Sequence, residues 1–353
     1  MACTGGERLV KTRHATNAIA NVVSLVMAIL SRARSWKRRI QTRGPYRDAA
    51  SSSGEVMNTG RVELLSFQTA MLCNPRSQVV MFLVLTAVLC LPPYYFIISA
   101  ESIDAIPDLV VVGIMWAPGV AALFTRLVCQ KNVRGFGWRL GPSRYLVFSY
   151  LLPVAAGLVI YGTVWATGLG DFTAERLARD AGFSVGLDVR SFWRSVFVAA
   201  TGGFVLEAVL ALGEELGWRG LLVPELAKLM PFGKIGFLSG SIWSFFHVPG
   251  ILFAGYHSAA PVWYGLVVFC VSFIAISFIL AWLRFKSGSV WTAVVFHASH
   301  NLFIQNLFDR MTVSRELTQY VTTEFGLGLA AVYSVVAYAC WRSRRELSAT
   351  HQR

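Results

Sequence analysis

Charged residues are scarce in this sequence. Lys, Arg, Asp and Glu make up 14% of its 353 residues, whereas hydrophobic residues make up 55%. A soluble globular domain has roughly 25% charged residues. The composition therefore excludes an ordinary soluble domain. It predicts an all-α polytopic membrane protein, because helices satisfy their own backbone hydrogen bonds in lipid.

Several common motifs are also missing. The six cysteines form no CxxC pair and have no regular spacing, so the sequence supports neither a disulfide framework nor a zinc-thiolate site. It contains no GxSxG and no HExxH. A hydrolase-elbow serine and a helix-borne zinc pair are therefore without support.

The net charge is strongly positive, at +13. In a soluble chain this excess would point to nucleic acid as a partner. Here most Lys and Arg residues flank apolar segments, which is the pattern that orients a protein in a membrane. We therefore expect the lipid bilayer, and no nucleic acid, as a partner.

Residues 1–56 differ in composition from the rest of the chain. They contain ten Lys or Arg and three acidic residues, with one apolar stretch from Ala18 to Leu30. That stretch is short for the ~20 residues of a membrane span. We predict a basic, disordered or weakly membrane-associated extension without a catalytic role. The alternatives are an interfacial helix, a targeting segment, and upstream sequence that precedes a start at Met57.

The remainder contains eight apolar segments, each long enough for a helix across ~30 Å of hydrocarbon. They cover residues 79–99, 106–127, 145–166, 194–213, 235–253, 263–283, 289–308 and 325–341. We expect three N-terminal spans with their loops in 57–189, a catalytic core in 190–310, and the last span with a basic tail in 311–353. The last five spans are expected to form the catalytic bundle.

Charge alternates between the two ends of these spans. The segment 126–144 is rich in Lys and Arg, whereas the opposite side carries Glu101, Asp104 and the uncharged segment 254–262. The positive-inside rule makes the basic side cytoplasmic. An even number of spans then places both termini in the cytoplasm, and Glu214 near the cytoplasmic end of the fourth span.

Ionisable groups inside spans are expensive, by ~2.5 to 3.5 kcal/mol on insertion scales, so each one marks a candidate functional site. The first group is Glu214, Glu215 and Arg219. Glu215 and Arg219 are four residues apart and can pair on one helix face, while Glu214 points ~100° away and is expected to be free. The alternative is a juxtamembrane ion pair without a catalytic role.

Two further spans carry polar residues. His247 lies on the fifth span, and Pro249 two residues later predicts a kink. On the seventh span His297 and Asn301 share a helix face, with His300 close beside them. Each group alone is explained by a packing histidine or an interhelical polar clamp. Together, in one half of the membrane, they predict a buried polar site shared by the bundle.

The members of this site limit its chemistry. A buried Glu214 beside His247 can act as a general base toward water. His297 and Asn301 can donate hydrogen bonds where a tetrahedral oxyanion forms. This division of labour fits hydrolysis of a peptide bond within the membrane.

The three motifs resemble those of the CPBP family, the CAAX prenyl protease and bacteriocin-processing (Abi) intramembrane endopeptidases. They are EExxxR from Glu214 to Arg219, an aromatic residue followed by His at Trp243 and His247, and HxxxN at His297 and Asn301. The resemblance covers about residues 190–310. The second motif often begins with Phe, so the aromatic Trp243 is expected to alter packing.

The resemblance implies an intramembrane protease in which Glu214 activates water with His247, while His297 and Asn301 stabilise the oxyanion. Glu215 and Arg219 would orient the helix or pair with substrate. A mechanism without a cofactor is favoured, because an Asn is a poor zinc ligand and a good oxyanion donor. In the alternative, Glu214, His247 and His297 hold Zn²⁺ and leave one position open.

The expected substrate is a peptide or lipid-modified peptide, cleaved near the cytoplasmic face. The short loops favour a bacterial inner membrane. Two other classes stay open: an ion- or proton-coupled transporter, because intramembrane Glu and His also form proton relays, and a catalytically idle immunity or scaffold protein. The halves show no internal repeat of the kind expected in a transporter. The sequence determines neither the substrate nor the oligomeric state.

Overall fold

The structure is a computed structural model that describes residues 73–99, 107–175 and 189–350. The predicted extension, residues 1–56, lies outside the described residues. Up to residue 215, the described residues form α3 (Pro75–Ser99), α4 (Asp108–Gln130), the 3-10 helix η2 (Arg134–Phe136), α5 (Ser143–Thr167), β1 (Gly170–Phe172), α7 (Val189–Val198), the π-helical segment η3 (Ala199–Gly203) and α8 (Phe204–Glu215). Then follow η4 (Leu216–Leu222), α9 (Val223–Ala227), α10 (Phe232–Phe253), α11 (Val262–Ser287), α12 (Trp291–His300), η5 (Asn301–Phe308), β2 (Thr312–Ser314), α13 (Thr318–Val321), α14 (Leu327–Arg342) and α15 (Arg345–Thr350).

Six helical segments of the described residues are long and apolar enough to cross a membrane. They are Pro75–Ser99, Leu109–Gln130, Ser143–Thr167, Phe192–Ala227, Phe232–Phe253 and Val262–Ser287. The other two predicted spans correspond to α12 with η5 and to α14, which has only 16 residues. The fold is therefore confirmed as all-α and polytopic, and the count of eight spans stays a prediction.

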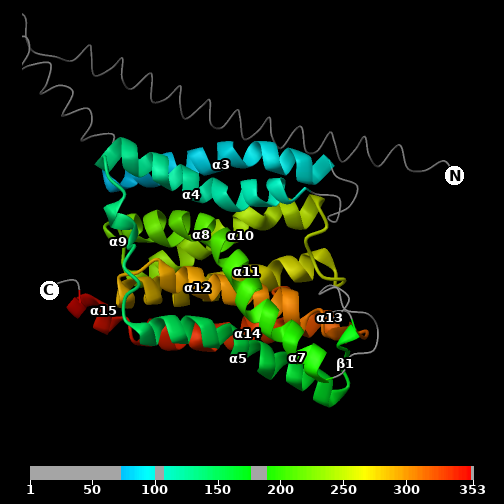
Figure 1. The fold of residues 1–353 in the computed structure, drawn as a ribbon. Coiled ribbons are helices and arrows are strands. Elements are labelled where there is room, and N and C mark those ends of the chain that lie inside the picture. Colours follow the sequence, from blue (N-terminus) through cyan, green and yellow to red (C-terminus); the bar gives the residue numbers. More distant parts are fainter. Residues whose placement is uncertain (1–72, 100–106, 176–188, 351–353) are drawn as a thin grey trace, which may run out of the picture.

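The helices form one bundle in which α8 has a central position. α3 and α4 pack side by side at one edge, and α5 and α14 lie at the opposite edge (Figure 1). α8 contacts both α4 and α12, and α11 contacts both α10 and α14. These contacts bring together the three helices that carry the polar motifs.

Glycines allow α8 to approach α4 closely. A Cβ atom on Gly213 would lie 2.7 Å from the backbone oxygen of Met115. On the other helix, a Cβ atom on Gly119 would lie 2.5 Å from the backbone oxygen of Gly213. Helices in membranes commonly use small residues for such backbone contacts. The contact fixes the position of Glu214, the next residue after Gly213, relative to α4.

Two segments that carry site residues contain π-helical turns. η4 begins directly after Glu215, and η5 begins at Asn301. Such turns inside α-helices are frequent at functional sites, and their i to i+5 hydrogen bonds bring residues five apart onto one side. In η5 this applies to Asn301 and Asn306.

A two-stranded sheet closes the end of the bundle where η5 finishes. β1 and β2 pair antiparallel, with Gly170 opposite Ser314. An exposed ion pair between Asp171 and Arg315, 2.7 Å between Oδ1 and Nη2, joins the same two loops. The sheet therefore ties the loop after η5 to the end of α5.

Candidate active site

Each of the three motifs contributes a polar residue to one pocket of about 240 Å³, whereas Glu215 and Arg219 do not line it. Glu214 comes from α8, His247 from α10, His297 from α12, and Asn301 from the start of η5. The pocket also has walls from α3 and α4, supplied by Tyr94, Ile97, Val111, Ile114 and Met115. It therefore draws on the first two helices and on four of the last five predicted spans, while α14 contributes no lining residue.

Two tryptophans hold the carboxylate of Glu214. Trp218 donates its Nε1–H to Glu214 Oε2 at 3.0 Å, and Trp243 donates to the same oxygen at 2.7 Å. The side chain is only 3% exposed, and a buried carboxylate needs such donors. The expectation that Glu214 has no partner is therefore wrong for Oε2. Among the described residues, its second oxygen, Oε1, makes no hydrogen bond.

Glu215 and Arg219 form a buried ion pair, with 2.9 Å between Oε1 and Nη1. Arg219 also donates from Nη2 to Ser277 Oγ on α11 at 3.0 Å, and its guanidinium lies 4.1 Å from the centre of the Trp243 ring. Pairing and hydrogen bonds make charge tolerable in a protein interior, although Arg219 Nε has no hydrogen-bond partner among the described residues. The pair thus connects α8 and η4 to α10 and α11.

His297 contacts Glu215 rather than Glu214. Its Nδ1 lies 3.0 Å from Glu215 Oε1. Because an ionised carboxylate only accepts hydrogen bonds, this nitrogen carries the hydrogen. The interaction fixes the ring and leaves Nε2 as the nitrogen available for other partners.

His247 is oriented by its own helix and by aromatic rings. Its Nδ1 lies 2.9 Å from the Trp243 backbone oxygen, so Nδ1 donates and Nε2 is left as an acceptor in the neutral ring. The ring centres of Phe246, Phe269 and Phe273 lie 5.1, 5.3 and 5.0 Å away. A neutral histidine with a free acceptor nitrogen suits the role of a base.

Asn301 binds a carboxylate that sequence reasoning missed. Its Nδ2 lies 3.3 Å from Glu207 Oε2, and Asn306 Nδ2 lies 3.0 Å from Glu207 Oε1. Glu207 precedes Glu214 by seven residues, which is two helical turns, so both side chains leave α8 on the same face. The seven-residue spacing from Glu214 is therefore the feature of the sequence that could have identified Glu207 as a site residue.

A second missed cluster adjoins the pocket through Gln305 and Tyr256, which line it. The buried Glu324 accepts hydrogen bonds from the Tyr256 hydroxyl at 2.6 Å and from Gln305 Nε2 at 2.9 Å. Burial raises the pKa of the Glu324 carboxyl above its ordinary value. His300, by contrast, does not line the pocket: its Nδ1 lies 3.0 Å from the Tyr333 hydroxyl.

In the alternative, three side chains of this pocket would hold Zn²⁺. Glu214, His247 and His297 line the same pocket. Within the part of the chain that the structure describes, however, no three His, Cys, Asp or Glu side chains are grouped to hold a metal ion. In this arrangement the three side chains do not fit a zinc site.

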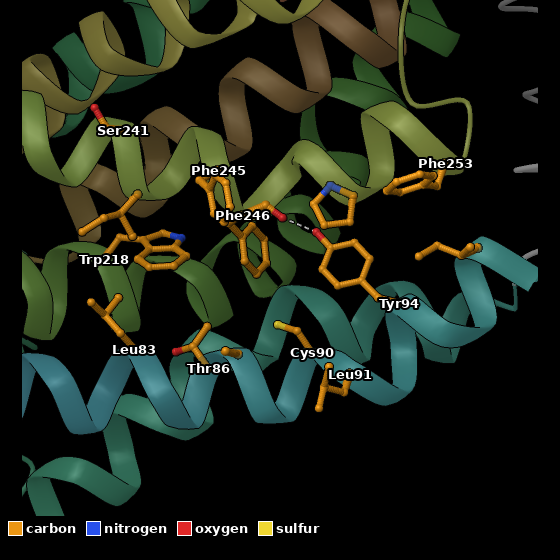
Figure 2. A pocket seen from close by; sticks show the side chains of 14 residues that line it. Leu83, Thr86, Cys90, Leu91, Tyr94, Trp218, Ser241, Phe245, Phe246 and Phe253 are labelled. Carbon is orange, nitrogen blue, oxygen red and sulfur yellow. Dashed lines mark hydrogen bonds between the residues drawn. The ribbon is translucent and has the colours of Figure 1, made fainter. Parts of the chain in front are cut away.

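A larger apolar cavity of about 540 Å³ lies between α3 and α10. Figure 2 shows Leu83, Thr86 and Cys90 on α3 facing Phe245 and Phe246 on α10.

Tyr94 and Phe246 line this cavity and also the polar pocket. The Tyr94 hydroxyl donates to the Phe246 backbone oxygen, as drawn in Figure 2. The apolar cavity therefore adjoins the pocket that contains Glu214.

Fold and site together define a polytopic helical membrane protein with a buried Glu/His/Asn pocket beside an apolar cavity. Residues 193–303 match the family model described as type II CAAX prenyl endopeptidase Rce1-like. A segment of 115 residues is 30% identical to the CAAX prenyl protease 2 of Methanococcus maripaludis, and covers 31% of this chain and 40% of that relative. The chain thus spans less than half of the relative's length. These matches confirm the resemblance to the CPBP family for the segment that carries the three motifs.

Proposed function

We propose that this protein is an intramembrane endopeptidase that hydrolyses a peptide bond near the cytoplasmic face of the membrane. One observation carries the proposal: Glu214, His247, His297 and Asn301, from three helical segments, line a single buried pocket. The match of residues 193–303 to the CAAX prenyl endopeptidases supports the same reaction.

The proposed reaction begins with a water molecule between Glu214 and His247. Glu214 Oε1 and His247 Nε2 are the acceptors left over after the indole and backbone hydrogen bonds. Glu214 Oε1 takes one proton from the water as its oxygen attacks the carbonyl carbon, while His247 Nε2 accepts a hydrogen bond from the other O–H of the water. When the C–N bond breaks, the same proton passes to the leaving amine.

The oxyanion that forms when water attacks the carbonyl carbon needs hydrogen-bond donors. His297 Nε2 serves when the ring carries both protons, a state that the Glu215 carboxylate on Nδ1 stabilises. Asn301 serves through one amide N–H. Removing one such donor typically costs about 10²- to 10³-fold in kcat.

The apolar cavity supports a substrate with an apolar portion. Its volume of about 540 Å³ lies in the usual range of roughly 300 to 1,000 Å³ for ligand sites. Because it adjoins the polar pocket, a lipid group or an apolar peptide segment can occupy it while the scissile bond reaches Glu214. A lipid-modified peptide fits both spaces.

The test is a cleavage assay with purified protein in liposomes. Peptide pairs that differ only in an isoprenyl thioether on one cysteine are incubated with the wild type, and mass spectrometry locates the cleaved bond. We expect cleavage that His247→Ala reduces at least about 100-fold. Glu346→Gln, at an exposed carboxylate that pairs with Lys286, is the matched control and should retain activity.

A parallel arm measures the metal content and the effect of a chelator. Full activity of metal-free protein agrees with the proposed mechanism, and activity that returns only with Zn²⁺ contradicts it. Ion or proton flux that survives Glu214→Ala, without any cleavage by the wild type, would instead identify a transporter.

A further inference from the structure

Glu207 is a carboxylate inside a predicted span that the reaction above does not use. Its neighbours Val205 and Leu206 are each 63% exposed, so they occupy the outer face of α8, and Glu207 is directed into the bundle. A carboxylate at such depth costs ~2.5 to 3.5 kcal/mol on insertion scales unless it has partners. Its partners are the two amides of η5, Asn301 and Asn306.

The hydrogen bonds from Asn301 and Asn306 to Glu207 are called the Glu207 clamp below. The π-helical register of η5 makes this clamp possible. In an α-helix, residues five apart point about 140° away from each other. The wider π-helical turn brings Asn301 and Asn306 to the same side, where each donates to a different oxygen of Glu207. Asn306 Nδ2 also lies 3.4 Å from the Asn301 backbone oxygen. The register that begins at Asn301 therefore presents both amides to one carboxylate.

The clamp also decides which way the Asn301 amide faces. An ionised carboxylate accepts hydrogen bonds and cannot donate them, so Glu207 selects the amide orientation with Nδ2 toward it. Nδ2 carries two hydrogens, and only one is used by Glu207. The other remains for an oxygen in the pocket that Asn301 lines. The opposite orientation would place Oδ1, an acceptor, where an oxyanion requires a donor.

We propose that Glu207 is a positioning residue for hydrolysis, which holds the Asn301 amide so that one N–H is directed to the oxyanion. This inference rests on the proposed function. Asn306 shares the carboxylate and fixes its second oxygen.

The first test compares two variants at this position. Glu207→Leu removes both acceptors and should lower kcat by about 10- to 100-fold, less than the loss of a donor itself, with KM within about 3-fold. Glu207→Gln keeps one acceptor oxygen for Asn301 and should restore most of kcat. Val205→Leu, on the outer face of the same turn, is the control and should leave both constants unchanged.

A double-mutant cycle separates positioning from a general structural role. If Glu207 acts through Asn301, Glu207→Leu should have little further effect on kcat in an Asn301→Ala background. An equal fold-loss in both backgrounds would overturn the proposal, as would unchanged kcat in Glu207→Leu. Glu207→Ala replaces the leucine variant if that variant does not fold.

A structure of the Glu207 variant supplies a readout that does not depend on activity. We expect the Asn301 side chain to change its orientation when the carboxylate is removed. An unchanged Asn301 orientation would contradict the positioning role even if the wild type cleaves no peptide. Absence of cleavage by the wild type, with a reoriented Asn301 in the variant, would count against the proposed function alone.

Discussion

Trp243 donates its indole N–H to the carboxylate of Glu214, a residue of a different helix, with 2.7 Å between Nε1 and Oε2. The sequence predicts only a packing role for the aromatic ring at this position. The indole nitrogen adds a hydrogen bond that a phenylalanine ring lacks. Trp243 therefore helps to orient the carboxylate proposed to activate water.

Replacing Trp243 by Phe tests this role. Trp243→Phe should lower kcat by about 10-fold, because a hydrogen bond to a charged group contributes about 1.5 to 3 kcal/mol and Trp218 still holds the same oxygen. Steady-state cleavage of a peptide measures the change. Trp263→Phe, at a ring that is 70% exposed on α11, should have no effect. Equal kcat in wild type and Trp243→Phe would show that the hydrogen bond is dispensable.

The close approach of α4 and α8 predicts a loss of stability in Gly119→Ala. The added Cβ atom would lie 2.5 Å from the backbone oxygen of Gly213, and such overpacking costs about 1 to 3 kcal/mol. Thermal unfolding in detergent should show a lower Tm. Gly113→Ala on the same helix meets nothing within 4 Å and should leave Tm almost unchanged. Equal Tm values for the two variants would contradict the close contact.

Filling the apolar cavity should separate lipid-modified from unmodified substrates. Ala87 lines this cavity on α3, and Ala87→Phe places a ring in it. The change should raise KM for the isoprenylated peptide by about 10-fold or more, since more than 1.4 kcal/mol of apolar contact is lost. KM for the unmodified peptide should change little. Val88→Phe, at an exposed neighbour, is the control; a similar KM increase for both peptides would argue against a lipid site.

Glu324 predicts a dependence of stability on pH. Burial raises the pKa of its carboxyl above the ordinary value of 4.5, so the folded state binds this proton more tightly than the unfolded state. The stabilisation from the protonated Glu324 carboxyl is complete below about pH 4.5. It is lost as the pH rises through the pKa of the folded state, with a slope of up to about 1.4 kcal/mol per pH unit. The Tm of the wild type should therefore decrease between roughly pH 5 and 8, and Glu324→Gln should make this decrease smaller. Parallel curves of Tm against pH for wild type and Glu324→Gln would contradict this role of Glu324.

The sequence predicted the helical course of the chain well. Within the described residues, most of each of the eight apolar segments is helical, because long apolar runs have few alternatives in a membrane. The spacing of Glu215 and Arg219 predicted an ion pair that the structure contains at 2.9 Å. Both predictions depend only on residues near each other in the chain.

Contacts between helices were harder to predict. His297 lies 82 residues from Glu215, and no local spacing indicates that its Nδ1 binds that carboxylate. Glu207 was missed for a related reason: its clamp on Asn301 and Asn306 depends on a π-helical turn, whereas the sequence was interpreted with α-helical spacing. These contacts are determined by tertiary packing and by a local change of helical register, and the sequence pattern indicates neither.

The central claim is that the Glu214 carboxylate activates the water that cleaves the peptide bond. Its most direct test is the single-turnover cleavage rate of Glu214→Gln, which keeps the size of the side chain and an oxygen for the two indoles but removes the base. We predict a rate at least about 10³-fold below that of the wild type, with unchanged peptide affinity and unchanged Tm. A variant that cleaves within a few-fold of the wild-type rate would contradict the account.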